Sequence, residues 1–122
     1  MNVLIIGGGI SGISAAKVVL KEGHNAVILE NTPELGGTMA RIANCRIGFK
    51  TFYDEIKDDP RLRVIREAAI ADVTKNGAGF AVTLTNGEAL NVDRVIVAAG
   101  LSPYDPVEYK GKRVMTSLEY DA

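Results

Sequence analysis

The fold is decided by the first thirty residues, MNVLIIGGGISGISAAKVVLKEGHNAVILE. The apolar run of residues 1–6 predicts a strand that is buried on both faces. Apolar residues at helical spacing over residues 13–22 predict a helix, which Gly23 ends. A second apolar run over residues 26–30 predicts another buried strand. A helix between two such strands indicates a β-α-β unit, with a parallel sheet and a right-handed connection.

Downstream, the pattern alternates between loop, helix and strand. The expected elements are a loop over residues 31–37, a helix over 51–58 and a third parallel strand over 62–65. The helix turns Phe52, Ile56 and Tyr53 inward and ends before Pro60. A last apolar strand covers residues 92–98, interrupted only by Asp93-Arg94.

Between the third strand and the last one, alternating residues predict a small antiparallel β-meander. Its strands cover residues 67–74, 79–85 and 88–92. The pair Asn86-Gly87 favours a two-residue hairpin in which both central residues have positive φ. We therefore expect an α/β fold: a small parallel sheet with one crossover helix, and an antiparallel meander layered onto it.

The turn between the first strand and the helix has the pattern G-x-G-x-x-G, formed by Gly7, Gly9 and Gly12. The first glycine permits a tight turn, the second lets the backbone approach a pyrophosphate, and the third lets helix and strand pack closely. The first helical turn, with Ile10 and Ser11, directs free N–H groups and the positive dipole end at the phosphates. This motif in this context indicates a Rossmann-like dinucleotide-binding domain.

Two further features bear on which dinucleotide binds. Glu30 ends the second strand, where its carboxylate can accept hydrogen bonds from both hydroxyls of an adenosine ribose. Asn31 follows it, so no arginine is present there to receive a 2′-phosphate. The pair Gly36-Gly37 lies just beyond, where a flavin dinucleotide passes its diphosphate and ribityl chain. An NAD-binding fold needs no such pair, so the sequence favours FAD.

As a set, these motifs and the strand ending in Val97-Ala98-Ala99-Gly100 resemble the FAD domain of glutathione-reductase-like flavoproteins over residues 1–100. The resemblance implies that backbone near Ile70 meets the adenine. It also implies that the chain turns beneath the cofactor at Ala99 and Gly100, where the family usually has Ala-Thr-Gly. The redox cysteine pair of disulfide reductases is missing: Met39 stands at the first position, and Cys45 is the single cysteine.

Two stretches, residues 95–106 and 114–120, are similar to the flavin subunit of heterodisulfide reductase and to its counterpart in the quinone-interacting membrane-bound oxidoreductase complex. Those families usually carry arginine after the glycine pair, where this chain has Thr38. The resemblance implies a cofactor contact at this position and partner proteins that carry iron–sulfur clusters. The cysteine-rich inserts of those families are absent from the chain.

The length and composition of the chain limit the number of domains and the kinds of partner that it can have. The 122 residues fit one domain, and the net charge of −1 with 24% charged residues leaves no basic surplus for nucleic acid. Without a signal peptide or an apolar stretch of membrane-spanning length, we expect a cytoplasmic protein that does not insert into membranes. A single cysteine also argues against a thiolate metal site within this chain.

The sequence therefore predicts one FAD-binding domain over residues 1–122, incomplete at its C-terminus, from an electron-transferring oxidoreductase. No catalytic residue is identified, and whether the isolated chain has activity is left open. Two alternatives remain: an NAD-binding domain of a dehydrogenase, and a non-enzymatic fragment that serves as an interaction surface. An apolar surface left by a missing domain would favour self-association.

Overall fold

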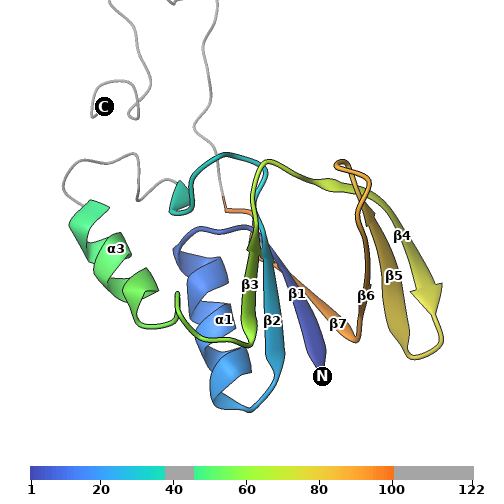
Figure 1. The fold of residues 1–122 in the computed structure, drawn as a ribbon, viewed down its shortest axis with the longest axis horizontal. Helices are drawn as coiled ribbons and strands as arrows, with labels where there is room; N and C mark the ends of the chain where they lie inside the picture. The colour runs from blue at the N-terminus through green and yellow to red at the C-terminus, as the bar shows by residue number, and fades with distance from the viewer. Residues whose placement is uncertain (38–45, 101–122) are drawn as a thin grey trace, which may run out of the picture.

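The computed structural model describes residues 1–37 and 46–100, which form three layers (Figure 1). Two helices lie on one face of a parallel sheet, and an antiparallel sheet lies on the other. The elements in chain order are β1 (Asn2–Ile6), α1 (Ile10–Lys21), β2 (Asn25–Leu29), α3 (Arg46–Asp54), β3 (Leu62–Ile65), β4 (Ile70–Asn76), β5 (Gly79–Leu84), β6 (Ala89–Val92) and β7 (Arg94–Val97). The predicted α/β class with a parallel sheet and a meander is confirmed.

The parallel sheet has the strand order β3-β2-β1-β7. Its central strand β1 pairs with β2 from Asn2↔Asn25 to Ile6↔Leu29, and with β7 from Val3↔Arg94 to Ile6↔Val97. All carboxyl ends therefore lie at one edge of the sheet, the upper edge in Figure 1, where α1 begins. In open α/β sheets this edge is where ligands bind.

Successive residues of a strand point to opposite faces, so β1 contributes to two separate cores. Val3 and Ile5 pack toward α1 and α3, together with Ile28 of β2. Leu4 packs on the other face against β5, where Val82 and Leu84 are buried. Both faces of the sheet are covered, which explains why its strands read as continuous apolar runs.

Both helices differ from their predicted bounds. α1 begins at Ile10, three residues before the predicted start, because Gly9 is its N-cap and Gly12 lies in its first turn. α3 covers Arg46–Asp54 where we predicted residues 51–58. Phe49 continues the inward pattern of Phe52 and Tyr53 toward the N-terminus, but Gly48, a poor helix former, obscures that pattern. Ile56 is buried as predicted, although it lies beyond the end of the helix.

The connections also correct two predictions. α3 lies between β2 and the parallel strand β3, so the sheet has a second helical crossover where we expected one. The single strand predicted over residues 92–98 is two strands in different sheets, because the chain turns a corner at Asp93. There the Asp93 N–H donates to Asn2 O, and Asp93 Oδ2 accepts the Asn2 N–H at 2.7 Å.

The meander is as predicted in outline, with strand order β4-β5-β6, but its first strand begins at Ile70 and its second turn differs. Leu84 N–H donates to Glu88 O and Gly87 N–H to Leu84 O, which closes a three-residue loop. Gly87 alone in this loop has positive φ, at 89°, as in hairpins that end in a glycine bulge. The two-residue turn is instead Gly77-Ala78, between β4 and β5.

Candidate functional site

The glycine turn lies at the carboxyl edge of the parallel sheet, between β1 and α1. Gly7 has φ of 112°, and a Cβ there would lie 2.1 Å from Ala98 O. A Cβ at Gly12 would lie 1.9 Å from Gly7 O. Both contacts are with backbone atoms, which cannot move aside. The first and third motif glycines therefore let the turn, the helix and the end of β7 pack together, as the motif predicts.

Gly9, the second motif glycine, faces open space. A Cβ there would have Gly36 O and Gly37 Cα as its nearest neighbours, both 3.9 Å away. The adjoining N–H groups of Ile10 and Ser11 have no acceptor among residues 1–37 and 46–100. Gly9 is the N-cap and has no side chain to cap the helix, so within the described part of the chain the N–H groups of the first turn are left for an external acceptor. This geometry fits a diphosphate.

Gly36 and Gly37 form the opposite side of that opening. Gly36 has φ of 118° and Gly37 of 53°, both in the region that favours glycine. The Gly36 N–H donates to Gly8 O at 2.8 Å, which holds the glycine pair against the turn. Thus the predicted pair does lie beside the G-x-G-x-x-G turn, although about 25 residues separate them in sequence.

Glu30 is buried beneath this turn, with 8% of its surface exposed. Its Oε1 accepts the Gly8 N–H at 2.9 Å. Its Oε2 accepts the backbone N–H of Thr32 at 3.0 Å and the Thr32 hydroxyl at 2.8 Å. A buried carboxylate is stable only when such donors surround it. Glu30 therefore links the end of β2 to the glycine turn.

Gly8 and Thr32 are the two residues that sequence reasoning missed at this site. A Cβ at Gly8 would lie 2.4 Å from Leu35 Cδ2 and 3.2 Å from Glu30 Oε1, so a larger residue there would displace the end of the Leu35 side chain. Thr32 supplies two of the three donors to Glu30. For Gly8 the sequence held no signal, because its partner Leu35 lies 27 positions away. For Thr32 the signal was its place two residues after an acidic strand end.

Four other predicted site residues lie in the described part of the chain. Ala99 and Gly100 follow β7 and are exposed, with Gly100 at φ 74°. Asn31 is exposed next to Glu30. Ile70 begins β4 and packs against the core between the two sheets. Thr38 lies outside the described residues, as do Met39, Cys45 and the segment after Gly100.

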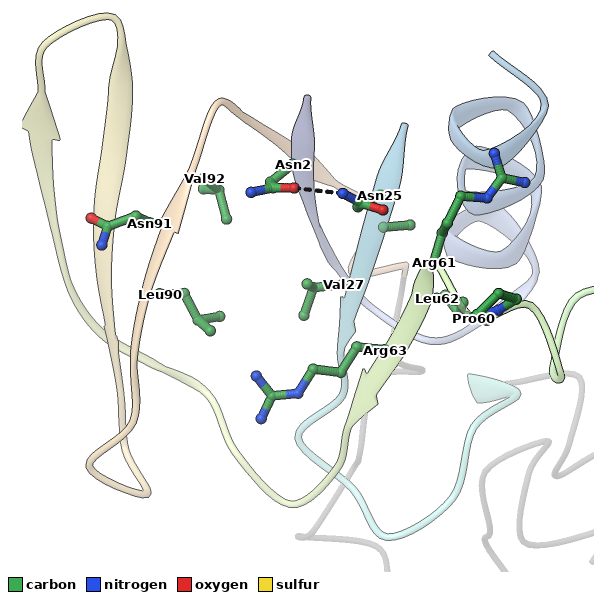
Figure 2. A pocket seen from close by; sticks show the side chains of 11 residues that line it. Asn2, Asn25, Val27, Pro60, Arg61, Leu62, Arg63, Leu90, Asn91 and Val92 are labelled. Carbon is green, nitrogen blue, oxygen red and sulfur yellow. Dashed lines mark hydrogen bonds between the residues drawn. The ribbon is translucent and has the colours of Figure 1, made fainter. Parts of the chain in front are cut away.

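A cavity of about 320 Å³ lies elsewhere, where the parallel strands begin (Figure 2). Asn2 and Asn25 line it and are joined by a hydrogen bond of 3.0 Å, and Arg63 extends from β3 along its side. Arg63 pairs with Glu88. Because this cavity lies at the amino ends of the strands, it is separate from the glycine turn.

Neither a metal site nor a membrane span is found in the part of the chain that the structure describes. There, no group of three His, Cys, Asp or Glu side chains is placed to hold a metal ion. No helix in residues 1–37 and 46–100 has the length and hydropathy of a membrane span. His24 is half-buried and accepts a hydrogen bond from the Met1 ammonium group at Nδ1, 2.9 Å away.

The fold is that of the Rossmann-like FAD/NAD(P)-binding oxidoreductases. A ferredoxin reductase from Rhodopseudomonas palustris superimposes with a TM-score of 0.65 and 26% identity, over 88% of this chain and 25% of its own. L-proline dehydrogenase from P. horikoshii has a TM-score of 0.72 at 23% identity, over 85% of this chain and 23% of its own. That second likeness concerns the fold alone.

The sequence identifies the family to which this chain belongs. The chain matches the pyridine nucleotide-disulphide oxidoreductase family over residues 1–117, and it belongs to that family. Membership implies a flavin cofactor and identifies the chain as a flavin oxidoreductase module, which confirms the family resemblance and the flavin expectation.

Two curated relatives are similar to this chain in part of their sequence. An iron-sulfur subunit of CoB–CoM heterodisulfide reductase from Methanopyrus kandleri is 33% identical over 96 residues, 68% of this chain and 14% of that protein. An L-amino acid oxidase from Cerastes cerastes is 35% identical over 66 residues, 54% of this chain and 13% of that protein. The resemblance to heterodisulfide reductase is confirmed. The chain spans about one seventh of the length of these relatives.

Proposed function

We propose that this chain binds FAD and serves as the flavin-holding domain of an electron-transferring oxidoreductase. The observation that carries the proposal is the opening between Gly9 and the Gly36-Gly37 pair, beside N–H groups of α1 that have no acceptor within residues 1–37 and 46–100. A diphosphate placed there would accept hydrogen bonds from the helix N-terminus and gain from its dipole. Bound FAD would supply the redox chemistry, and the protein would hold and orient it.

Each predicted site residue has a role in this proposal. Gly7 and Gly12 shape the turn, and Gly9, Ile10 and Ser11 face the diphosphate. Glu30 and Asn31 lie at the adenosine ribose, with the backbone near Ile70 at the adenine ring. Gly36, Gly37 and Thr38 pass the ribityl side, and Ala99 with Gly100 lies beneath the cofactor. No residue is assigned a catalytic role.

The choice of FAD over NAD rests on two features. The Gly36-Gly37 pair closes over the turn through the Gly36 N–H to Gly8 O hydrogen bond, a contact that an NAD-binding fold does not need. The β4–β6 meander lies between β3 and β7 in the chain, an insertion before the last parallel strand that an NAD-binding fold does not need. A competition titration of FAD against NAD separates the two alternatives, because NAD would displace FAD only if the site were a nicotinamide dinucleotide site.

We further propose that the working protein includes redox partners with iron–sulfur clusters, because one relative is itself named as an iron-sulfur subunit. A dithiol–disulfide cycle needs two sulfurs, and this chain has one cysteine. Electrons leaving the flavin would therefore pass to a partner or to a part of the protein beyond this chain.

The test is a flavin absorbance spectrum of the purified protein, followed by titration with FAD monitored by flavin fluorescence. We expect saturable binding that is weakened at least about tenfold in Gly9→Val, because the added side chain fills the space for the diphosphate and costs about 1.4 kcal/mol or more. Ser14→Val adds the same branched side chain one turn further along α1, on its exposed side. This control should bind as the wild type does. Equal affinity in Gly9→Val and the wild type would contradict the proposal.

A further inference from the structure

The carboxylate of Glu30 is already largely engaged before any ligand binds. A carboxylate has two oxygens with about four acceptor positions in total. Oε2 receives both Thr32 donors, its N–H at 3.0 Å and its hydroxyl at 2.8 Å. Among the residues that the structure describes, Oε1 receives only the Gly8 N–H, at 2.9 Å. One acceptor position is therefore left on the carboxylate, and it lies on Oε1, next to the glycine turn.

The Thr32 hydroxyl has one proton and two acceptors within reach. Glu30 Oε2 is 2.8 Å away and Glu34 O is 2.9 Å away. The charged carboxylate is the stronger acceptor, so the hydroxyl proton points to Glu30. The Thr32 carbonyl is itself held, because it accepts the Glu67 N–H at 3.3 Å. Thr32 is thus anchored on the backbone side and fixes Oε2 with its side chain.

From this geometry we propose that Thr32 is a positioning residue for nucleotide recognition. It holds Glu30 so that Oε2 is closed and Oε1 alone receives a hydroxyl of the adenosine ribose. Glu30 then recognises the ribose through one hydroxyl. From the sequence we expected its carboxylate to accept hydrogen bonds from both hydroxyls. The inference rests on the proposed dinucleotide function, since it assigns how the same site reads the ribose.

The experiment compares ADP with 2′-deoxy-ADP and 3′-deoxy-ADP by isothermal titration calorimetry on the full chain. In the wild type, we expect one deoxy analogue to bind like ADP and the other about tenfold more weakly, as for loss of one hydrogen bond to a charged group. In Thr32→Val, which keeps the side-chain shape and removes the hydroxyl, that difference between the analogues should disappear. Thr32→Ser restores the donor and should restore the difference.

A second readout needs no ligand. The Gly8 amide proton reports its hydrogen bond to Glu30 Oε1 in a ¹H–¹⁵N NMR spectrum. We expect its resonance to move in Thr32→Val and to stay in place in Thr32→Ser. A role that is only structural would lower thermal stability in Thr32→Val while leaving the Gly8 resonance and the analogue difference unchanged.

The outcomes separate the two proposals. If the wild type binds neither FAD nor ADP, the proposed function is overturned, and the Gly8 resonance alone then decides whether Thr32 orients Glu30. If the wild type binds ADP and both deoxy analogues lose affinity equally, recognition through one hydroxyl is overturned. If Thr32→Val behaves as the wild type in both measurements, Thr32 is not a positioning residue.

Discussion

At the scale of single residues, the atoms around each glycine of the turn decide whether a side chain could be accommodated there. Gly7 and Gly12 are restricted by backbone atoms close by, Ala98 O and Gly7 O, whereas Gly8 is restricted by the side chain of Leu35. The G-x-G-x-x-G pattern leaves Gly8 as a variable position. Leu35 and the Glu30 carboxylate both lie against it. The end of the Leu35 side chain can move aside, so a substitution at Gly8 should be tolerated better than one at Gly7 or Gly12.

Glu67 is the one non-glycine residue with positive φ in residues 1–37 and 46–100, at 57°. An L-residue in this conformation costs roughly 1–2 kcal/mol. The N–H groups of Glu67 and Ala68, which donate to Thr32 O and Glu30 O at 3.3 Å, hold it there. The strained backbone therefore lies in the segment whose N–H groups bind the carbonyls of Glu30 and Thr32.

We expect Glu67→Gly to stabilise the protein by about 0.5–1 kcal/mol, the relief of strain less the extra chain entropy of glycine when unfolded. The change in the free energy of unfolding is measured by urea unfolding, followed by circular dichroism. Glu67→Ala removes the same carboxylate but keeps the strained backbone, so it should unfold near the wild-type midpoint. A glycine variant no more stable than the alanine variant would show that the backbone at this position is not strained.

At the scale of elements, α3 is tied to α1 through Lys17. Its ammonium group lies 3.2 Å from the centroid of the Phe52 ring, and it also pairs with Glu55. Glu55 is largely exposed, so the ion pair contributes little, and the contact with the ring accounts for more. Phe49 and Tyr53, stacked with centroids 6.3 Å apart, complete the buried side of α3. Contacts with α1 thus place a helix that its own sequence marks weakly.

The entry to β3 is held by a local ion pair. Arg61 donates its side chain and its backbone N–H to the Asp59 carboxylate, and these hydrogen bonds lower the pKa of Asp59 below its usual value. A carboxyl whose pKa is lower in the folded state stabilises the fold above its unfolded pKa. That contribution is lost as the pH falls through the lowered pKa.

We therefore expect Asp59 to titrate in the folded protein below the ordinary aspartate range near 3.8. Its side-chain NMR shift measured against pH gives the value. In Arg61→Gln the pKa should rise toward the ordinary one, and the stability difference between this variant and the wild type should narrow below about pH 4. Since the pair is exposed, the effect on stability is small. An Asp59 pKa that is the same in both proteins would contradict the assignment.

At the scale of the whole molecule, the two sheets share one core. Leu4 and Leu29 of the parallel sheet pack with Val82, Leu84 and Val92 of the antiparallel one. The antiparallel sheet is three-stranded, and so small a sheet is stable only when a face packs on something else. The described layers should therefore unfold together.

We expect Leu84→Ala to lower the free energy of unfolding by about 2–5 kcal/mol, because Leu84 is 2% exposed and truncation leaves a cavity. Thr83→Ala on the exposed side of the same strand should change it by less than about 0.5 kcal/mol. Calorimetry of both variants makes the comparison. Two separate transitions in Leu84→Ala, with the parallel sheet melting at the wild-type temperature, would contradict a shared core.

Much of the fold could be predicted from the sequence because its information is local. Continuous apolar strands, the glycine turn and Gly23 indicate the β-α-β unit, and β3 lies at residues 62–65 as predicted. The positions of four candidate site residues could be predicted for the same reason, because Gly7, Gly9, Gly12 and Glu30 follow one another through a single strand–turn–helix–strand unit. The periodicity of the apolar residues, together with the turn signals between the apolar runs, is enough to place residues that are close in sequence.

Only the tertiary structure decided the contacts between distant segments. The corner at Asp93 depends on Asn2, the packing at Gly8 depends on Leu35, and the position of α3 depends on its contact with α1. Propensity and periodicity describe how a segment would fold by itself, whereas these features arise when one segment limits the space or supplies the hydrogen-bond partner of another. The sequence by itself therefore determined the β-α-β unit with its glycine turn, and the packing determined how Glu30 is held beneath that turn.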